Sequence, residues 1–237
     1  MKKISISIFS VLFALVVSST NLTAGSIGLG VSGAFMNVEA DGKETSGTTG
    51  SETDTSVNTA AVDNDVFIGS IYAEYITDGG YAFGIEHIPA SADVSDKVKT
   101  RTDTELSVTG DVTTNSDTRQ FKAQAEIDDY FNYYVEVPLF GENFFAKLGY
   151  AQVDVNTTET ASSNGGNYGN ATLDGFNYGI GVKSKPTDNT RLKFAYEITD
   201  FESLSLTSTG NSVASETNKI SADLDTWALK VSFGYEF

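Results

Sequence analysis

The sequence predicts an all-β fold, an eight-stranded antiparallel up-and-down transmembrane β-barrel, and three observations lead to this prediction. Apolar residues alternate with small or charged residues in eight segments, which is the pattern of strands with one apolar face. The connections between these segments alternate between long and short. No stretch after residue 25 approaches the roughly 18 consecutive apolar residues of a membrane-spanning helix. The predicted strands are residues 26–38, 65–77, 81–91, 119–138, 144–156, 174–184, 190–202 and 222–237.

Three of the connections are short. The sequence Asp-Gly-Gly at residues 78–80 is a hairpin turn signal between the second and third predicted strands. Residues 139–143 form the second short connection. Residues 185–189 form the third, in which we expect Pro186 to set the turn.

The other four connections are long, polar and rich in Thr, Ser, Asn and Gly, and we expect them to be loops. They include residues 39–65 and residues 92–118. Every second connection of an up-and-down barrel lies at the same end, so the long loops share one end and the tight turns share the other with both termini. Outer-membrane barrels sort their connections in this way, with short periplasmic turns and longer extracellular loops.

The N-terminus predicts a secretory signal peptide. Lys2 and Lys3 precede an apolar run from residue 4 to residue 17, and the following polar segment ends on the small residue Ala24. We therefore expect residues 1–24 to be the signal peptide and residues 25–237 to be one outer-membrane barrel domain with four long extracellular loops. An uncleaved anchor helix is the alternative interpretation of this segment.

The last predicted strand shows how the two faces of each strand differ. From Trp227 to Phe237 every second side chain is apolar, and the residues between them are small or charged. The charged residues on the second face of the eight strands are nearly balanced, although the whole chain carries a net charge of −17. We predict that they form an ionic network in the lumen: Glu74, Glu86, Glu136, Lys147, Lys183, Lys193, Glu197, Lys230 and Glu236.

The apolar face is predicted to meet lipid. An eight-stranded barrel is just wide enough for side chains to fill it, and small residues with paired charges suit such an interior. Eleven residues at about 3.3 Å each, tilted by about 40°, span roughly 25 Å, the height of a lipid-facing band. Trp227 and Phe237 would then lie at the two membrane interfaces. A soluble barrel or sandwich is the alternative.

Composition excludes several functional classes. A strongly acidic chain, with 32 acidic against 15 basic residues, lacks the basic footprint that nucleic acid requires. The absence of Cys excludes disulfides and thiol chemistry. The single histidine, His87, continues the apolar outward face of its predicted strand, so we expect it to lie at the membrane interface. We expect no catalytic residues.

Pairs of carboxylates occur near the loop ends of the predicted strands, at residues 63–65, 128–129 and 223–225. Hard oxygen ligands of this kind bind divalent cations, which could bridge to lipopolysaccharide phosphates. A solvated acidic rim is the interpretation that we favour, because no twelve-residue calcium-loop pattern is present. We predict no metal site and no cofactor.

A signal peptide, eight amphipathic strands and a final strand that ends in an aromatic residue resemble the small outer-membrane β-barrel proteins of Gram-negative bacteria, the OmpA, OmpX and opacity-like group. The resemblance covers residues 26–237. It implies a location in the cell outer membrane, with outer-membrane lipid and lipopolysaccharide as surroundings. It also implies that the barrel-assembly machinery reads the last strand as an assembly signal, carried by Leu229, Val231, Phe233, Tyr235 and Phe237.

The fold of this group hosts many activities, so it does not fix the function. We expect a non-enzymatic protein with a side-chain-filled lumen, acting as a structural or interaction protein at the cell surface through its extracellular loops. The alternative is a porin-like channel for small solutes.

Overall fold

The computed structural model describes residues 25–45, 57–94, 99–109, 112–141, 143–161, 168–209 and 219–237. The predicted signal peptide, residues 1–24, lies outside the described residues. The strands are β1 (Gly25–Thr45), β2 (Val57–Thr77), β3 (Ala82–Ile88), β4 (Ala92–Asp93), β5 (Lys99–Thr109), β6 (Val112–Pro138), β7 (Phe144–Ala161), β8 (Ala171–Thr187), β9 (Thr190–Phe201), β10 (Leu204–Thr207) and β11 (Lys219–Glu236).

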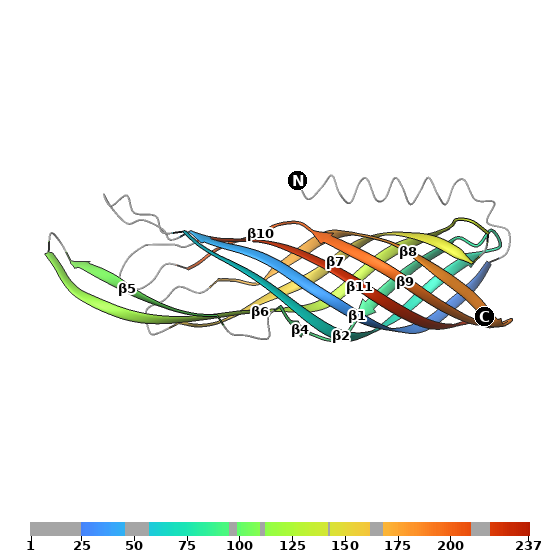
Figure 1. Cartoon of the computed structure of the whole chain (residues 1–237), viewed down its shortest axis with the longest axis horizontal. Coiled ribbons are helices and arrows are strands. Elements are labelled where there is room, and N and C mark those ends of the chain that lie inside the picture. Colours follow the sequence, from blue (N-terminus) through green and yellow to red (C-terminus); the bar gives the residue numbers. More distant parts are fainter. Residues whose placement is uncertain are drawn as a thin grey trace.

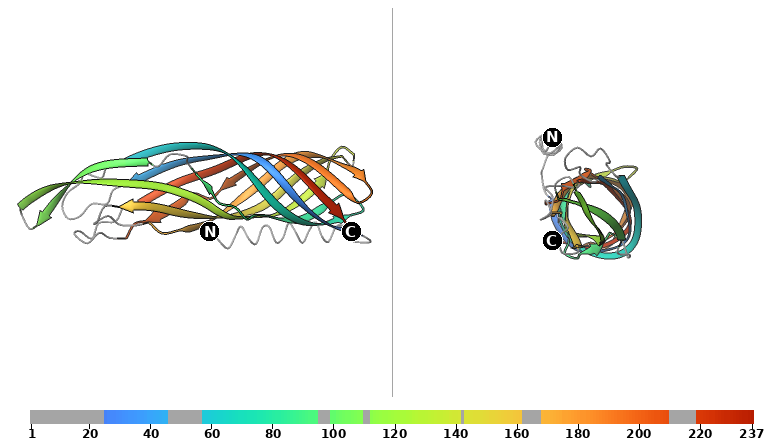
Figure 2. Two further views of the ribbon diagram at one scale, coloured as in Figure 1. Left: turned by 90° about the horizontal axis from the view of Figure 1, so that it is seen from below. Right: turned by 90° about the vertical axis from the view of Figure 1, so that its left-hand side faces the viewer.

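Eight of these strands form a closed antiparallel ring in the order β1-β2-β3-β6-β7-β8-β9-β11, and β11 pairs with β1 to complete it. This confirms the predicted fold class, because each barrel strand overlaps one of the eight predicted segments. The end-on view in Figure 2 shows the ring, and the long strands are strongly tilted in Figure 1. A closed ladder satisfies the backbone hydrogen bonds without water, as a lipid environment requires.

The three tight turns lie at the same end of the barrel as Gly25 and Phe237. In the first turn the Gly80 amide donates to the Thr77 carbonyl over 2.9 Å, and Gly80 has a φ of +81°. Gly141 takes a φ of +77° in the second turn. Glycine enters this left-handed region without a steric penalty, which explains its place in both turns.

The third turn differs from the expectation. Strand β8 continues through Pro186 to Thr187, and the turn is formed by Asp188 and Asn189. The register of β8 against β9 shifts between Ser184 and Thr187. Proline has no amide hydrogen for the ladder, so it is accommodated at this irregularity and not in the turn itself.

Two regions that we expected to be loops are largely strand. Residues 39–45 and 57–64 extend the β1–β2 hairpin with an unbroken register. Strand β5 and the start of β6 occupy much of the region 92–118 and pair with each other. The prediction was wrong here because these stretches are polar in sequence, which hid their content of the β-branched residues that favour strands. Figure 1 shows the resulting long β5–β6 hairpin at the end of the barrel opposite the C-terminus.

The ladder is incomplete on one side of the barrel. Strand β2 pairs with the short strand β3 only over Ile71–Ile76, so among the described residues its outer part has a ladder partner only in β1. Strand β6 passes from β3 to β4 through a bulge beside Asp129, which has a φ of +47°. Pro89 lies at this break and has no amide hydrogen. One side-chain bond crosses the gap, from Asn64 Nδ2 to the Asp93 carbonyl at 2.8 Å.

The apolar face of the ring points outward. Phe67 is 84% exposed, Ile180 63% and Phe237 72%, whereas the intervening residues of the same strands are buried or half-buried. A soluble barrel would bury these side chains, and a water-exposed apolar surface that encircles a whole domain does not occur in monomeric soluble proteins. The sidedness is that of a membrane-embedded outer-membrane barrel. No helix among the described residues is long and apolar enough to cross a membrane.

Candidate functional site

The interior of the barrel is the candidate functional site, because it gathers the buried charges. The structure places all nine residues of the predicted lumen network on the inner face, each at most 8% exposed. They lie in three layers along the barrel axis, which we call the middle, lower and end tiers. The lower and end tiers lie progressively nearer the tight turns.

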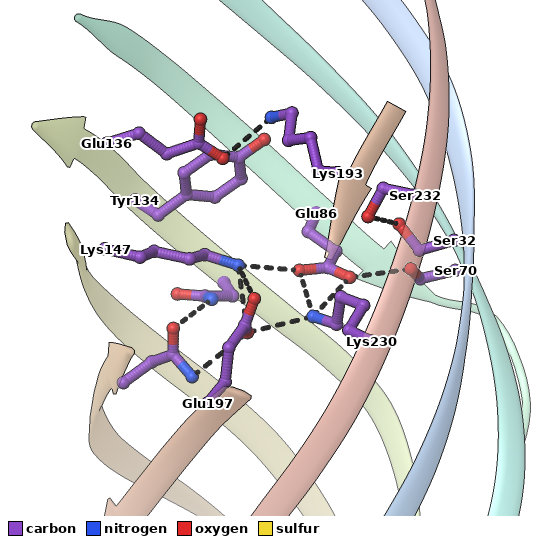
Figure 3. Close-up of polar contacts among 12 residues, drawn as sticks. Ser32, Ser70, Glu86, Tyr134, Glu136, Lys147, Lys193, Glu197, Lys230 and Ser232 are labelled. Atoms are coloured by element: carbon purple, nitrogen blue, oxygen red, sulfur yellow. Dashed lines mark hydrogen bonds and ion pairs between the residues drawn. The ribbon is translucent and has the colours of Figure 1, made fainter. Parts of the chain in front are cut away.

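The middle tier consists of Glu86, Lys147, Glu197 and Lys230. Lys147 Nζ lies 3.2 Å from Glu86 and 2.9 Å from Glu197. Lys230 Nζ lies 2.8 Å from Glu86 and 2.9 Å from Glu197. Each ammonium therefore bridges both carboxylates, and the tier is electrically neutral (Figure 3).

Polar side chains from the neighbouring strands complete the middle tier. Ser70 donates to Glu86 over 2.6 Å. Asn132 donates to Asn177 over 2.9 Å, and Asn177 donates in turn to Thr199 over 3.0 Å. The charged residues of the sequence do not by themselves indicate that these polar side chains belong to the lumen. The sequence signal for these polar residues is their spacing, because each lies an even number of residues from a lumen charge on the same strand.

The lower tier is built around Lys193, whose Nζ lies 2.6 Å from Glu74 and 2.7 Å from Glu136. The Tyr134 hydroxyl donates to Glu74 over 3.0 Å, and the ammonium of Lys193 lies 5.0 Å from the centre of the Tyr72 ring. Two carboxylates surround one ammonium here, so aromatic rings and a hydroxyl supply the remaining contacts.

Small residues make room for these rings. A Cβ added to Gly84 would overlap the Tyr134 ring, and one added to Gly30 would overlap the Tyr72 ring. These two inner-face glycines are paired with cross-strand tyrosines, since Gly84 lies opposite Tyr134 and Gly30 opposite Tyr72. The lumen is filled by rings at the level of these glycines.

The end tier closes the barrel beside the tight turns. Glu236 is paired with Lys185 at 2.7 Å and with Arg191. Lys183 donates to the Gly80 carbonyl over 2.8 Å, which ties β8 to the first turn. The sequence analysis did not place Arg191 in the lumen network, although this residue lies within the predicted strand 190–202. Arg191 is 5% exposed and points inward, on the same face of β9 (Thr190–Phe201) as Lys193.

Little free space remains among the tiers. A small cavity lies between the middle and lower tiers, bordered by both ion-pair groups and by Tyr72 and Phe145. The Tyr72 hydroxyl and Glu136 Oε2 make no hydrogen bond within the protein. Ion pairs, rings and hydroxyls occupy this section of the lumen almost completely, and the charge pairing offsets part of the desolvation of the buried charges.

The half of the interior farther from the turns is apolar, which the sequence analysis did not anticipate. The inner faces change there from charged residues to aliphatic ones, and the fully buried residues include Val38, Ala151 and Val153. This apolar core continues the inner registers of the same strands. The alternation pattern could have revealed it, because Ala151, Val153 and Val155 alternate with the polar residues Gln152 and Asp154.

The outward carboxylates form an acidic belt beyond the aromatic residues. Glu39 lies opposite both Asp63 and Asp225, and Asp225 lies opposite Asp200. Desolvation and these neighbouring carboxylates, with Asp200 foremost, raise the pKa of Asp225. No group of three or more candidate metal ligands is found among the described residues.

The remaining singled-out residues lie on the outer surface. His87 stacks on Phe131 with ring centres 4.2 Å apart, and its Nδ1 lies 3.2 Å from the Tyr130 carbonyl. The five residues of the proposed assembly signal point away from the barrel axis, and their exposed fractions range from 43% to 72%. They are Leu229, Val231, Phe233, Tyr235 and Phe237.

No known family model matches the chain, and no curated protein matches it in sequence. Solved structures of similar fold are outer-membrane proteins. OprG from Pseudomonas aeruginosa is 15% identical, with 90% of this chain and 96% of that chain covered and a TM-score of 0.48. Ail, the attachment invasion locus protein of Yersinia pestis, is 12% identical, with 91% and 100% covered and a TM-score of 0.41. The outer membrane protease OmpT from Escherichia coli is 9% identical, with 92% and 100% covered and a TM-score of 0.43.

Proposed function

We propose that this protein is a non-enzymatic structural or interaction protein of the outer-membrane surface. In this proposal the lumen is closed, and the extracellular sheet carries the function. The observation that supports it best is the neutral middle tier, in which two ammonium groups each contact both carboxylates. An interior of this kind stabilises a barrel and leaves no continuous path for a solute.

The extracellular part offers a surface suited to contacts. Strand β1 continues about eight residues beyond Asn37, which is roughly 25 Å of extended chain. Its outward side chains there include Glu39 and Asp41, in register with other carboxylates. An acidic, rigid sheet of this kind favours partners with a basic surface, since complementary charge steers association.

Planar-bilayer conductance of the refolded protein tests the closed lumen. We expect no discrete current steps from the wild type. A matched variant, Tyr134→Ala with Phe145→Ala, removes two buried rings from the lumen and should conduct. Heat-modifiable migration of both proteins would show that both are folded. Discrete steps from the wild-type protein would favour the porin-like channel and contradict the proposal.

Labelling of intact cells with a membrane-impermeant amine reagent tests the orientation on which the surface role depends. Lys43 and Lys219 are exposed at the far end of the β1–β11 pair, and Lys185 is exposed beside the tight turns. We expect modification of Lys43 and Lys219 and protection of Lys185 until the outer membrane is permeabilised. The reverse pattern would place the acidic sheet in the periplasm and overturn the surface role.

A further inference from the structure

The extracellular part of the barrel consists of two sheets. The pairing of β8 and β9 ends at Ala171 and Phe201, and β3 pairs with β2 no farther out than His87. Beyond these points, the ladders among the described residues join β10, β11, β1 and β2 into one sheet, which we call the β1 sheet. The ladders of β4, β5 and β7 with β6 form the other, which we call the β6 sheet.

The two sheets lie on opposite sides of the barrel mouth. Three strands separate β7 from β1 in either direction around the ring. In Figure 1 the outer ends of β1 and β2 are separated from β6. The bond from Asn64 to the Asp93 carbonyl joins the two sheets at the level of Val38, which lies opposite Asn64. Farther out, side chains must set the distance between the sheets.

One side chain crosses from the β6 sheet to the outer end of the β1 sheet. Tyr168 precedes β8, and its hydroxyl donates to Glu44 Oε1 of β1 over 3.0 Å. Glu44 shares the inner face of β1 with Val38 and Ala40, because an even number of residues separates these positions. The bond therefore spans the mouth. Its acceptor is a carboxylate, which makes the bond stronger than one between neutral groups.

The backbone around Tyr168 is fixed to β7. The Thr157 hydroxyl donates to the carbonyls of Tyr168 and Gly169, at 3.2 and 3.3 Å. The Thr157 amide donates to Asn170 Oδ1 over 3.2 Å. These bonds begin where the β7–β8 ladder ends. Tyr168 is thus held by the β6 sheet, and its bond to Glu44 is a bond between the two sheets.

This bond lies above the outer end of the apolar core. Val38 and Val155 are buried there, and the half-buried residues Ala40 and Val62 pack against the core. Glu44 is four residues beyond Ala40 on the same face of β1, which is roughly 13 Å of extended chain. Separation of the sheets at the level of Glu44 would expose the half-buried residues to water.

We propose that Tyr168 and Glu44 form a latch that holds the two extracellular sheets closed over the apolar core. While the hydroxyl is bonded to the carboxylate, the sheets form one rigid unit. When the bond is lost, their outer ends separate. The latch does not depend on the proposed surface function, because it requires no partner and concerns only the position of the sheets.

Distance measurements between two spin labels test the latch on the folded barrel in lipid nanodiscs. The chain has no Cys, so introduced cysteines carry the only labels. Asp41→Cys places one label on the outer face of β1, and Asn156→Cys places the other on the outer face of β7. We expect one narrow distance distribution by double electron–electron resonance while Tyr168 and Glu44 are present. Tyr168→Phe and Glu44→Ala should each broaden it and shift it to longer distances.

Further variants separate the hydrogen bond from general effects. Glu44→Gln keeps an acceptor oxygen and should keep the narrow distribution. Tyr178→Phe is the matched control, because it removes a hydroxyl that donates to Asp200 over 3.2 Å within the barrel wall, and it should change nothing. The double variant Tyr168→Phe with Glu44→Ala should be no broader than either single variant, because both remove the same bond. Heat-modifiable migration of each variant would show that its barrel is folded.

Three results would overturn the latch. The first is a broad distribution in the protein that keeps Tyr168 and Glu44, because the closed arrangement would then not be held. The second is a narrow distribution in both Tyr168→Phe and Glu44→Ala. The third is a distribution of Tyr178→Phe or Glu44→Gln as broad as that of Tyr168→Phe, because the cause would then not be this hydrogen bond.

Discussion

At the scale of single residues, the lumen depends on how many partners each charge has. Lys147 contacts two carboxylates in the middle tier, and both carboxylates also contact Lys230. Removal of one ammonium leaves two acids with one base in a buried setting. Charge balance within the tier matters more here than any individual pair, because an uncompensated buried charge is the costly outcome.

We therefore predict that Lys147→Met lowers the free energy of unfolding by about 3–5 kcal/mol. The double variant Lys147→Met with Glu86→Gln restores neutrality and should recover at least half of this loss. Urea unfolding of the barrel in detergent micelles would measure both values. Additive losses, with the double variant less stable than either single variant, would show that the tier does not act as one neutral unit.

The acidic belt produces a pH dependence with a definite sign. Desolvation and the nearby carboxylates raise the pKa of Asp225, so the folded protein binds a proton there more readily than the unfolded chain does. Stability is consequently lost as the pH rises through this raised pKa, and the repulsion is fully present at neutral pH.

The variant Asp225→Asn should stabilise the protein at pH 7 by a few tenths of a kcal/mol, since the group is largely exposed and solvent screens it. The gain should vanish below the ordinary aspartate pKa of about 3.9, where folded and unfolded chains are both protonated. It should also shrink in 1 M NaCl, where the Debye length falls to about 3 Å. A gain that persists at low pH would indicate a cause other than charge.

At the scale of elements, the pairing of glycine with tyrosine explains how the strands approach one another. Gly84 of β3 leaves the space that the Tyr134 ring of β6 fills, and Tyr134 then reaches Glu74 of β2. The absence of a Cβ at Gly84 thus allows the Tyr134 side chain to connect three strands of the barrel wall. The packing and the polar network depend on each other at this point.

We predict that Gly84→Ala destabilises the barrel by about 1–3 kcal/mol, because the added methyl group displaces the Tyr134 ring and weakens its bond to Glu74. Gly33→Ala is the matched control, since a Cβ at Gly33 meets nothing within 4 Å. Unfolding midpoints in the same detergent provide the comparison. Equal effects of the two substitutions would show that Tyr134 adapts without loss.

The alternation of residues predicts the eight barrel strands and their apolar face, because a period-two pattern is visible without knowledge of the neighbouring strands. It predicts neither β5 and β10 nor where the barrel strands end. The β1–β2 extension was expected as a loop, since Glu39, Asp41 and their polar neighbours resemble solvated connections. The partner of each charge is likewise absent from the pattern: nothing local indicates that Lys193 contacts both Glu74 and Glu136.

At the scale of the whole molecule, the interior is divided in two. Ionic tiers fill the part beside the tight turns, and an apolar core fills the part beyond them. Charges indicate the ionic part in the sequence, whereas the apolar part is harder to recognise, because the apolar positions of a strand such as β7 change from the outer face to the inner face after Tyr150. The wall gap also escapes prediction, since it depends on the short reach of β3.

The central claim concerns the sidedness of the barrel, with apolar residues toward lipid and charges enclosed. Methyl NMR of the protein in nanodiscs that contain a paramagnetic lipid tests it without altering the lumen. Val231 and Leu148 point outward at 43% and 56% exposure, whereas Val38 and Leu173 are 0% and 6% exposed. We predict that the lipid broadens the methyl signals of Val231 and Leu148 and leaves those of Val38 and Leu173 sharp. Broadening of Val38 and Leu173 with sharp signals from Val231 and Leu148 would contradict the account.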